Sequence, residues 1–469
     1  MSGLVLTNTR TRRKERFEPL EPGHVRIYTC GPTVYSAQHV GNMRPNVFAD
    51  LLKRGFLAEG YRVTHVINVT DVGHLTRDDE DAGEDKMELA AQRAGRRAVD
   101  LAVEITAQWQ EDRRRLGCLE PEVLCRATDH ISDQIEMIRT LEAKGVTYRI
   151  PDGIYFDVSK FPRYGEFARL DRERLLAGSR IGQVEGKRHP ADFALWKFPP
   201  PGAKRQQEWD SPWGRGFPGW HIECSAMATR YLGSSFDVHT GGVEHVKVHH
   251  TNEIAQSETA LDVHPWVRFW LHEDWIVFDG EKMAKSRGNV VVLQDLVDRG
   301  LLARSLRFFF LQAHYRKQQH FHDDAIASAD RGYRRLLQQT LPLRDAPGAP
   351  DPARLAEPRQ RFWDAVRDDL NAPRALAVAV EMARDEARPA AERRALLEEF
   401  DTWLALDLLR AEPPDESREA DPRIDELVAR REQARTRRDF AEADRLRDAL
   451  AAEGVTVEDT PDGPRWRRS

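Results

Sequence analysis

Cysteine is scarce in this chain of 469 residues, and long apolar runs are missing. The four cysteines are Cys30, Cys118, Cys125 and Cys224, and no two of them form a Cys-x-x-Cys pair. A disulfide framework is therefore not expected, and metal binding or catalysis is the better interpretation of these thiols. No apolar run approaches the ~18 residues that a membrane helix needs, and residues 1–13 hold no apolar stretch of the signal-peptide type. We expect a cytoplasmic protein that does not associate with membranes.

An excess of positive charge is absent as well. The formal net charge is −6, which argues against a protein coated with basic residues for nucleic-acid binding. Local basic patches remain possible, and contact with phosphate requires no more than these. Hydrophobic residues make up 40% of the chain and charged residues 32%. The length allows about three domains of ~100–200 residues, with a sizeable core and a strongly charged surface.

The first part of the chain has the order strand, turn, helix, strand. Residues 24–30 and 61–69 are rich in apolar and β-branched residues, as buried parallel strands are. In the segment between them, residues 46–59, apolar residues recur at helical spacing. This order predicts a doubly wound sheet whose ligand site lies at the carboxyl ends of the strands. Cys30 and Thr70 both fall at such ends.

The rest of the chain departs from this pattern twice. An acidic loop at 78–85 and long charged helices over 86–116 and 127–144 indicate an insertion, and the chain from about 319 is typical of a helix bundle. We expect an α/β fold with a parallel sheet, an α+β insertion, an all-α bundle and a small C-terminal domain. The predicted parts are two halves of a catalytic domain (1–72 and 216–318), the insertion (73–215), the bundle (319–411) and the C-terminal domain (416–469).

Four residues suggest a metal site. His249 and Glu253 are four apart, so on a helix their side chains lie one turn apart on one face. Cys30 and Cys224 would add two thiolates, and a set of two sulfurs, one nitrogen and one oxygen favours zinc. Two alternatives stay open: a core histidine beside unrelated cysteines, or a closed structural zinc site with four protein ligands.

Two further stretches suggest phosphate contact. Lys282 and Lys285 lie in a loop-like segment, where preplaced ammonium groups could stabilise charge on a transferring phosphate; a solvated turn is the alternative. His39 and Gly41 precede a helix, whose N-terminus offers free N–H groups to an anion.

Near the end of the chain, Trp466 lies among arginines. The ring could stack on a base while the arginines hold phosphate; a solvated face is the alternative.

Five segments occur in the order seen in cysteinyl-tRNA synthetases, and the resemblance runs from about Leu6 into the C-terminal domain. The segments are 28–35, 39–42, 219–227, 249–258 and 282–286. The resemblance implies a class I aminoacyl-tRNA synthetase with a Rossmann-like catalytic core. Such an enzyme activates L-cysteine with ATP to cysteinyl-adenylate and pyrophosphate, and then transfers cysteine to the 3′ end of tRNA(Cys).

The resemblance also implies roles for single residues, one Zn²⁺ per chain, Mg²⁺ with ATP, and a monomer. Cys30, Cys224, His249 and Glu253 would hold the zinc, which also takes the substrate thiolate, and Gly31, Thr70 and Trp220 would line the cysteine pocket. His39, Asn42, Lys282 and Lys285 would be catalytic, and these four together with Gly41 and Ser286 would bind ATP. The parts 319–411 and 416–469 would bind tRNA.

Direct coordination of sulfur fits the discrimination that such an enzyme needs. A hydrophobic pocket separates near-isosteres by only ~1–3 kcal/mol, whereas a zinc–sulfur bond rejects the harder hydroxyl of serine. A weakly held Glu253 could make room for the thiolate, which answers the objection that four protein ligands close the shell.

The sequence departs from the family at Asn42, which replaces a histidine of the general class I motif, and at Ala284, which replaces the usual serine. The stretch after Thr70 also lacks the commoner Asp-rich form, which affects where the insertion starts.

Two other functions compete with this interpretation. A paralogous ligase would activate cysteine in the same way and pass it to a small amino sugar, but such paralogues lack a full anticodon-binding region. A non-enzymatic tRNA-binding protein would not need to keep Lys282, Lys285 and His39 together with all four candidate ligands.

A lysine substitution tests the enzymatic interpretation. We expect Lys285→Ala to leave folding and tRNA binding intact and to collapse adenylate formation, because a cation at the transferring phosphate is lost. Cysteine-dependent pyrophosphate exchange measures this step. Exchange at the parent rate would contradict the role of Lys285.

Overall fold

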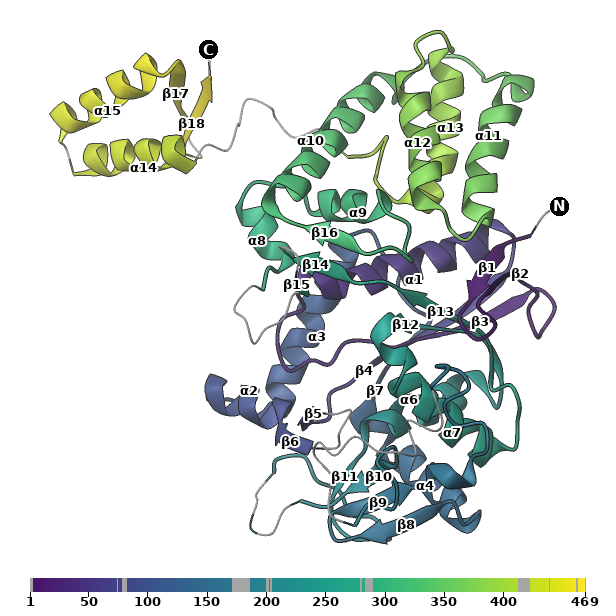
Figure 1. Ribbon diagram of the computed structural model, residues 1–469. Helices are drawn as coiled ribbons and strands as arrows, with labels where there is room; N and C mark the ends of the chain where they lie inside the picture. The colour runs from purple at the N-terminus through teal and green to yellow at the C-terminus, as the bar shows by residue number, and fades with distance from the viewer. Residues whose placement is uncertain are drawn as a thin grey trace.

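The structure is a computed structural model (Figure 1). It describes residues 3–73, 75–77, 82–170, 186–199, 202, 205–278, 281–282, 290–411, 422–437, 439–460 and 463–468. Of the predicted site residues, Lys285 and Ser286 lie outside the described residues, as does Ala284, and Lys282 is described only as a part of a strand.

A sheet of five parallel strands forms the centre of the protein, as the sequence predicts. The strand order is β13-β12-β3-β4-β7, and each neighbouring pair is parallel. The strands are β3 (His24–Thr29), β4 (Arg62–Val69), β7 (Val123–Arg126), β12 (Phe236–Gly242) and β13 (Val267–Glu273). They are largely buried, which fits their nearly continuous apolar sequences.

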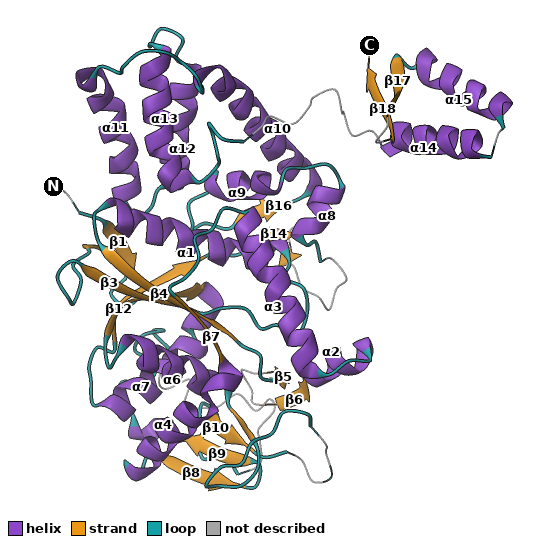
Figure 2. Ribbon diagram, turned by 180° about the vertical axis from the view of Figure 1, so that it is seen from behind, coloured by secondary structure: helices purple, strands orange, loops and turns teal. Residues whose placement is uncertain are grey.

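Helices cover both faces of this sheet, so the fold is doubly wound (Figures 1 and 2). On one face lies α1 (Val40–Ala58), which packs against β4. On the other face lie α6 (Trp220–Leu232), α7 (His249–Leu261) and α4 (Ile131–Ala143), which pack against one another. The functional segments that join strands to helices therefore meet at the carboxyl edge of the sheet.

The helix α1 begins six residues earlier than predicted. His39 is its N-cap, and His39 Nδ1 accepts a hydrogen bond from the backbone N–H of Asn42 at 3.2 Å. Pro45, which lacks an N–H, lies inside the helix without ending it. The side-chain cap, which the residue pattern did not show, moves the start of the helix to Val40.

The segment 73–215 contains both a separate sheet and a strand of the central one. Its own antiparallel sheet consists of β8 (Thr147–Ile150), β9 (Gly153–Phe156) and β10 (Phe193–Lys197), and β11 (Phe217–Pro218) adds the last strand. The edge strand β7, however, pairs with β4. The central sheet thus takes one strand from within the predicted insertion, and the domain boundaries stay predictions.

The single long helix expected over 86–116 is two helices. They are α2 (Lys86–Ala94) and α3 (Ala98–Arg115). Gly95 ends α2 in the left-handed conformation, with φ of 62°, which glycine adopts at little cost. The short strands β5 (Leu75–Arg77) and β6 (Ala82–Asp85) precede them.

A bundle of helices follows the strands of the central sheet, as expected. It contains α10 (Asp323–Thr340), α11 (Pro352–Arg367), α12 (Ala372–Arg384) and α13 (Ala390–Leu404). The C-terminal part contains α14 (Pro422–Thr436), α15 (Phe440–Ala452), β17 (Val455–Thr460) and β18 (Gly463–Arg468). Other elements are β1 (Val5–Asn8), β2 (Arg13–Arg16), β14 (Ile276–Phe278), β15 (Glu281–Lys282), β16 (Gln319–Phe321), α8 (Leu293–Asp298) and α9 (Ala303–Leu311). Within the described residues, no helix has the length and apolar character needed to cross a bilayer.

The suggestion that Trp466 stacks on a base is wrong. Trp466 is only 5% exposed and packs with Ile424, Val428 and Leu450 in the core of the C-terminal part. Its indole N–H donates to Asp425 Oδ1 at 2.7 Å. Trp466 is a core residue although arginines flank it in the sequence, because β18 packs against α14.

A buried ion pair joins α1 to the helices that follow the sheet. Arg307 Nη2 lies 2.6 Å from Asp50 Oδ2, and both side chains are at most 1% exposed. Arg307 also donates to the carbonyl oxygen of Leu404, and Asp50 accepts from the backbone N–H of Leu119. Burial by itself would raise the pKa of Asp50, but Arg307 and Arg54 lower it below its usual value. The carboxylate therefore stays ionised.

Removal of Asp50 should destabilise the protein strongly. We expect Asp50→Ala to lower the free energy of unfolding by about 3–5 kcal/mol, because Arg307 is left buried without its counter-ion. Urea unfolding followed by tryptophan fluorescence measures the change. As a control, Asp368→Ala removes an exposed partner of Lys14 and Arg374 and should cost less than about 1 kcal/mol. Equal losses in the two variants would contradict this account.

Candidate active site and metal centre

A cavity of about 490 Å³ opens at the carboxyl edge of the central sheet. Its lining includes most of the site residues that the sequence predicts, from both halves of the chain. These are Cys30, Gly31, His39, Asn42, Thr70, Trp220, Cys224 and His249. The fold thus brings the two predicted features, the metal ligands and the residues at a helix N-terminus, to one cavity.

The chain leaves β3 at a point where only glycine fits. A Cβ atom on Gly31 would lie 1.6 Å from the carbonyl oxygen of Asn68. The Gly31 N–H instead donates to the Asn68 side chain at 2.9 Å, and Thr70 donates its N–H to Pro32. This close crossing of the two strand ends fixes Cys30 and Thr70 in the cavity wall.

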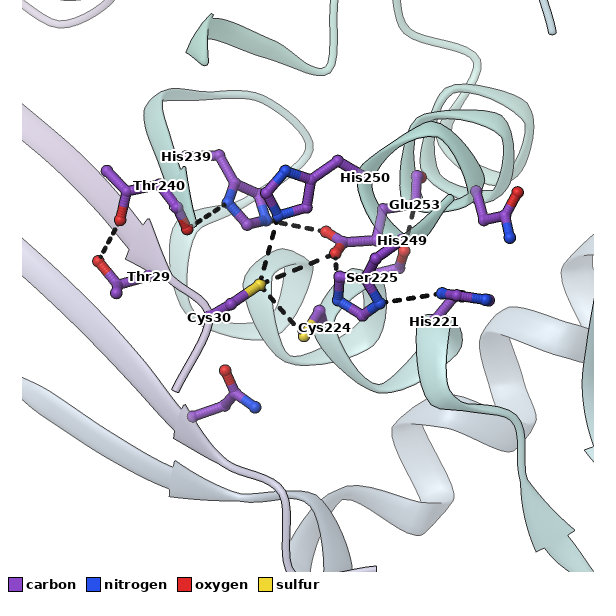
Figure 3. A network of polar contacts seen from close by, with 12 residues as sticks. Thr29, Cys30, His221, Cys224, Ser225, His239, Thr240, His249, His250 and Glu253 are labelled. Carbon is purple, nitrogen blue, oxygen red and sulfur yellow. Dashed lines mark hydrogen bonds and ion pairs between the residues drawn. The ribbon is translucent and has the colours of Figure 1, made fainter. Parts of the chain in front are cut away.

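Four candidate metal ligands converge at the base of the cavity (Figure 3). One ligand atom from each of Cys30, Cys224, His249 and Glu253 lies within 4.8 Å of the others. The two sulfurs are 4.0 Å apart, and His249 Nε2 is 2.7 Å from Glu253 Oε1. Two sulfurs at the usual ~2.3 Å from a tetrahedral zinc would be about 3.8 Å apart. The residues therefore fit a zinc ion in donor type and in spacing.

The protonation of this cluster follows from its mutual contacts. A hydrogen bond with Cys30 lowers the pKa of Cys224 to about 6 in spite of burial, whereas burial raises the pKa of Cys30 well above its ordinary value. Burial would lower the pKa of His249, but Glu253 raises it to about 10. Burial would raise the pKa of Glu253, but His239 and His249 lower it to about 2. Metal binding to this set releases protons, as it does wherever thiol and imidazolium become ligands.

A layer of further histidines, which no motif in the sequence had indicated, surrounds the cluster. His239 Nε2 lies 2.8 Å from Glu253 Oε2, and His221 Nδ1 lies 2.9 Å from His249 Nδ1. His250 Nε2 lies 3.5 Å from Cys30 Sγ. Such partners orient metal ligands and fix their tautomers. The available signal was the crowding of histidines at positions 221, 239, 245, 249, 250, 264 and 272.

A second set of potential ligands overlaps the first. Cys30, His239, His250 and Glu253 also place one ligand atom each within 4.8 Å of one another. The sets share Cys30 and Glu253, so they describe one centre in which the two carboxylate oxygens of Glu253 point in different directions.

The helix N-terminus forms the other end of the cavity. His39 and Asn42, at the start of α1, both line it. Because His39 Nδ1 accepts from the backbone of Asn42, the ring proton is on Nε2. A Cβ on Gly41 would lie 3.0 Å from the His39 ring, so a glycine keeps that ring in place. An anionic group could meet a donor side chain and the positive end of the helix here.

Trp220 and Glu273 complete the walls. The Trp220 ring lies 4.2 Å from the His249 ring, centroid to centroid, and so packs against one of the four candidate ligands. Glu273 ends β13 and is 4% exposed, and Oε2 has no hydrogen-bond partner within the described residues. Burial, followed by repulsion from Glu244, raises the pKa of Glu273 to about 8. No motif in the sequence had indicated Glu273.

Two family models match the chain. Residues 16–331 match the catalytic domain of class I (C) tRNA synthetases, and residues 417–467 match the cysteinyl-tRNA ligase anticodon-binding domain. The model boundaries place the site described above inside the first match.

Curated relatives match over the whole length. Cysteine--tRNA ligase 1 of Burkholderia lata is 46% identical over 464 residues, which cover 98% of this chain and 96% of the relative. Cysteine--tRNA ligase of Thermus thermophilus is 41% identical over 482 residues, with 99% of each chain covered.

Solved structures share the fold at low identity. A Mycobacterium tuberculosis methionyl-tRNA synthetase in complex with methionyl-adenylate is 16% identical, with a TM-score of 0.55 over 90% of this chain and 96% of that chain. A ternary complex containing a leucyl-tRNA synthetase of Agrobacterium radiobacter is 12% identical, with a TM-score of 0.58 over 83% and 84% of the chains. The sheet, the catalytic-domain match and the full-length relatives agree: this chain belongs to the cysteine--tRNA ligases, a family of class I aminoacyl-tRNA synthetases.

Proposed function

We propose that the cavity activates L-cysteine with ATP and passes it to tRNA(Cys), and that a zinc ion at its base selects the substrate thiolate. The observation that carries this proposal is the convergence of Cys30, Cys224, His249 and Glu253 beside the N-terminus of α1. A metal site that binds sulfur and a helix N-terminus that binds anions thereby share one cavity of about 490 Å³.

The donor chemistry supports zinc as the metal. Two thiolates with one imidazole and one carboxylate suit a borderline-soft ion. Bound there, zinc supplies a Lewis acid that prefers the sulfur of cysteine to the oxygen of serine. His239 holds the second oxygen of Glu253 and His221 contacts His249, so these two ligands are oriented in advance.

The cysteine pocket is bounded by residues on three separate segments. Gly31 and Thr70 lie at the crossing of β3 and β4, and Trp220 starts α6 across the cavity. We assign these three residues to cysteine binding. The backbone contacts at Gly31 and Thr70 leave this part of the pocket little freedom, so a small amino acid would be held in one orientation.

Adenylate formation takes place at the helix end of the cavity. The carboxylate of cysteine attacks the α-phosphorus of ATP, the bond to the bridging oxygen breaks, and pyrophosphate leaves. His39 Nε2–H and the α1 N-terminus, with Asn42 and Gly41, face the phosphates. Lys282, Lys285 and Ser286 add cations and a hydroxyl, and Mg²⁺ accompanies the nucleotide. Stabilisation of the negative charge that develops is the main catalytic effect.

The transfer step uses the adenylate in the same cavity. A hydroxyl of the terminal ribose of tRNA(Cys) attacks the activated carbonyl carbon, AMP leaves with the electrons of the broken C–O bond, and the proton of the hydroxyl passes to the departing phosphate or to water. The bundle 319–411 and the C-terminal part 416–469 bind the tRNA in this scheme, and the halves 1–72 and 216–318 perform the chemistry around the insertion 73–215.

Charging of total cellular tRNA separates the competing functions. We expect labelled cysteine to enter tRNA in the presence of ATP, and excess serine to reduce the label little, because zinc binds a hydroxyl poorly. Adenylate without labelled tRNA would favour transfer to a small amine. No activation by zinc-replete protein would contradict the enzymatic proposal.

Substitution of one ligand tests the metal centre. Cys224→Ser should lose bound zinc and weaken cysteine binding by at least ~10²-fold, because loss of a group that only orients a ligand already costs ~10–100-fold, while ATP binding changes little. Metal analysis and equilibrium dialysis with labelled cysteine measure the two effects. Cys118→Ser is the matched control, because Cys118 is also buried but lies in the other hydrophobic core. Undiminished cysteine binding by zinc-free protein would refute coordination of the thiolate.

A further inference from the structure

The amide side chain of Asn68 joins the two strand ends that border the cysteine pocket. Asn68 is the last residue but one of β4, lines the cavity and is 1% exposed. Its Oδ1 accepts the backbone N–H of Gly31 at 2.9 Å, and its Nδ2 donates to Thr70 Oγ1 at 3.1 Å. The proposed function uses Gly31 and Thr70, but it gives the residue that connects them no part in the reaction.

The direction of both hydrogen bonds follows from the contact with Gly31. A backbone N–H can only donate, so the end of the Asn68 amide that faces Gly31 is the oxygen. The other end is then the NH₂ group, which can only donate to Thr70 Oγ1. Thr70 Oγ1 is the acceptor in this bond, and the proton of its own hydroxyl points elsewhere.

Thr70 itself is fixed at the wall of the cavity. Its backbone N–H donates to the carbonyl oxygen of Pro32 at 3.0 Å, and its carbonyl oxygen accepts the N–H of Val34 at 3.2 Å. Within the part of the chain that the structure describes, Asn68 is the one partner of the Thr70 hydroxyl. A ligand in the cavity therefore meets a hydroxyl that is held in place and has a proton to donate.

The carboxylate is the group of cysteine that accepts such a proton. An ammonium group has donors only, and the thiolate belongs to the metal in the proposed function. The carboxylate is also the group that attacks the α-phosphorus of ATP. A hydroxyl that fixes its orientation therefore helps to place the attacking oxygen for adenylate formation.

A purely structural role would require only one end of the Asn68 side chain. An aspartate at this position would satisfy the Gly31 N–H equally well, because its carboxylate has acceptors only. The same carboxylate would also accept from Thr70, and would turn the hydroxyl proton away from the cavity. An amide, which accepts at one end and donates at the other, leaves that proton for a ligand.

We propose that Asn68 is a positioning residue, which directs the hydroxyl proton of Thr70 toward the carboxylate of bound cysteine. This inference rests on the proposed function, in which the cavity binds cysteine. Asn68 acts through Thr70 and not through the metal ligands. Loss of its donor should therefore weaken the binding of cysteine and leave the zinc content unchanged.

Two substitutions of nearly unchanged size test the direction of the hydrogen bond. Asn68→Asp keeps an acceptor for Gly31 and loses the donor, and Thr70→Val removes the hydroxyl. We expect each to weaken the binding of labelled cysteine by zinc-replete protein by about 10–10²-fold, which corresponds to the loss of one hydrogen bond to a charged group. Equilibrium dialysis measures the binding, and metal analysis checks the zinc content. Cysteamine, which lacks the carboxylate, should bind to Thr70→Val as tightly as to the parent.

A double-mutant cycle separates the effect of the hydroxyl from the effect of the new charge. Asn68→Asp also brings a negative charge near the substrate, and this effect persists when the hydroxyl is gone. In the Thr70→Val background, Asn68→Asp should weaken cysteine binding less than in the parent, by roughly fivefold or more, because no hydroxyl is left to turn. Asn46→Asp is the matched control, since Asn46 also lines the cavity but donates to the carbonyl oxygen of Asn42 within α1. Its effect on cysteine binding should be the same with and without the Thr70 hydroxyl.

Each outcome bears on a different statement. Parent-like cysteine binding by Asn68→Asp, equal losses from Asn68→Asp in the two backgrounds, or loss of zinc from this variant would overturn the positioning role and leave the proposed function intact. Weaker binding of cysteamine to Thr70→Val would overturn the assignment of the hydroxyl to the carboxylate. A parent protein that binds no cysteine would contradict the proposed function itself. A smaller loss without the hydroxyl, together with unchanged cysteamine binding, supports the proposal.

Discussion

Parallel pairing of β3 with β4 on one side and with β12 on the other is the constraint on which the site depends. Parallel strands end at one edge of the sheet, so the segments that follow them leave it together. Cys30 follows β3 and Thr70 follows β4, while β12 leads toward α7 with His249 and Glu253. Cys30 and Glu253 are separated by 223 positions in the chain. Only the fold around the sheet brings their side chains within 4.0 Å of each other.

The cluster at the base of the cavity shows how a buried charged site can persist. An ionised Glu253 without partners would be costly in the interior. His239 and His249 each approach one of its oxygens, at 2.8 Å and 2.7 Å, and keep its pKa near 2. The same contacts fix the direction in which its oxygens point. Electrostatic compensation and orientation of a ligand are thus two results of one arrangement.

The helix α1 joins the cavity to the helices that follow the central sheet. Its N-cap His39 and the nearby Asn42 line the cavity, and Arg44 donates to the carbonyl oxygen of Asp274 just before β14. Further along, Asp50 joins Arg307, and the indole of Trp403 donates to a carbonyl of the helix. One helix therefore extends from the cavity to the helix bundle.

The sequence by itself determined the elements whose signals are local. Buried parallel strands have apolar, β-branched sequences, and the spacing of His249 and Glu253 places them on one helical face. The types of residue then indicated four candidate ligands, and the fold brings one ligand atom from each within 4.8 Å of the others. Tertiary structure alone decided that β7 joins the central sheet, that Trp466 is buried, and that histidines such as His239 surround the cluster. Each of these depends on partners far away in the chain, which residue patterns do not encode.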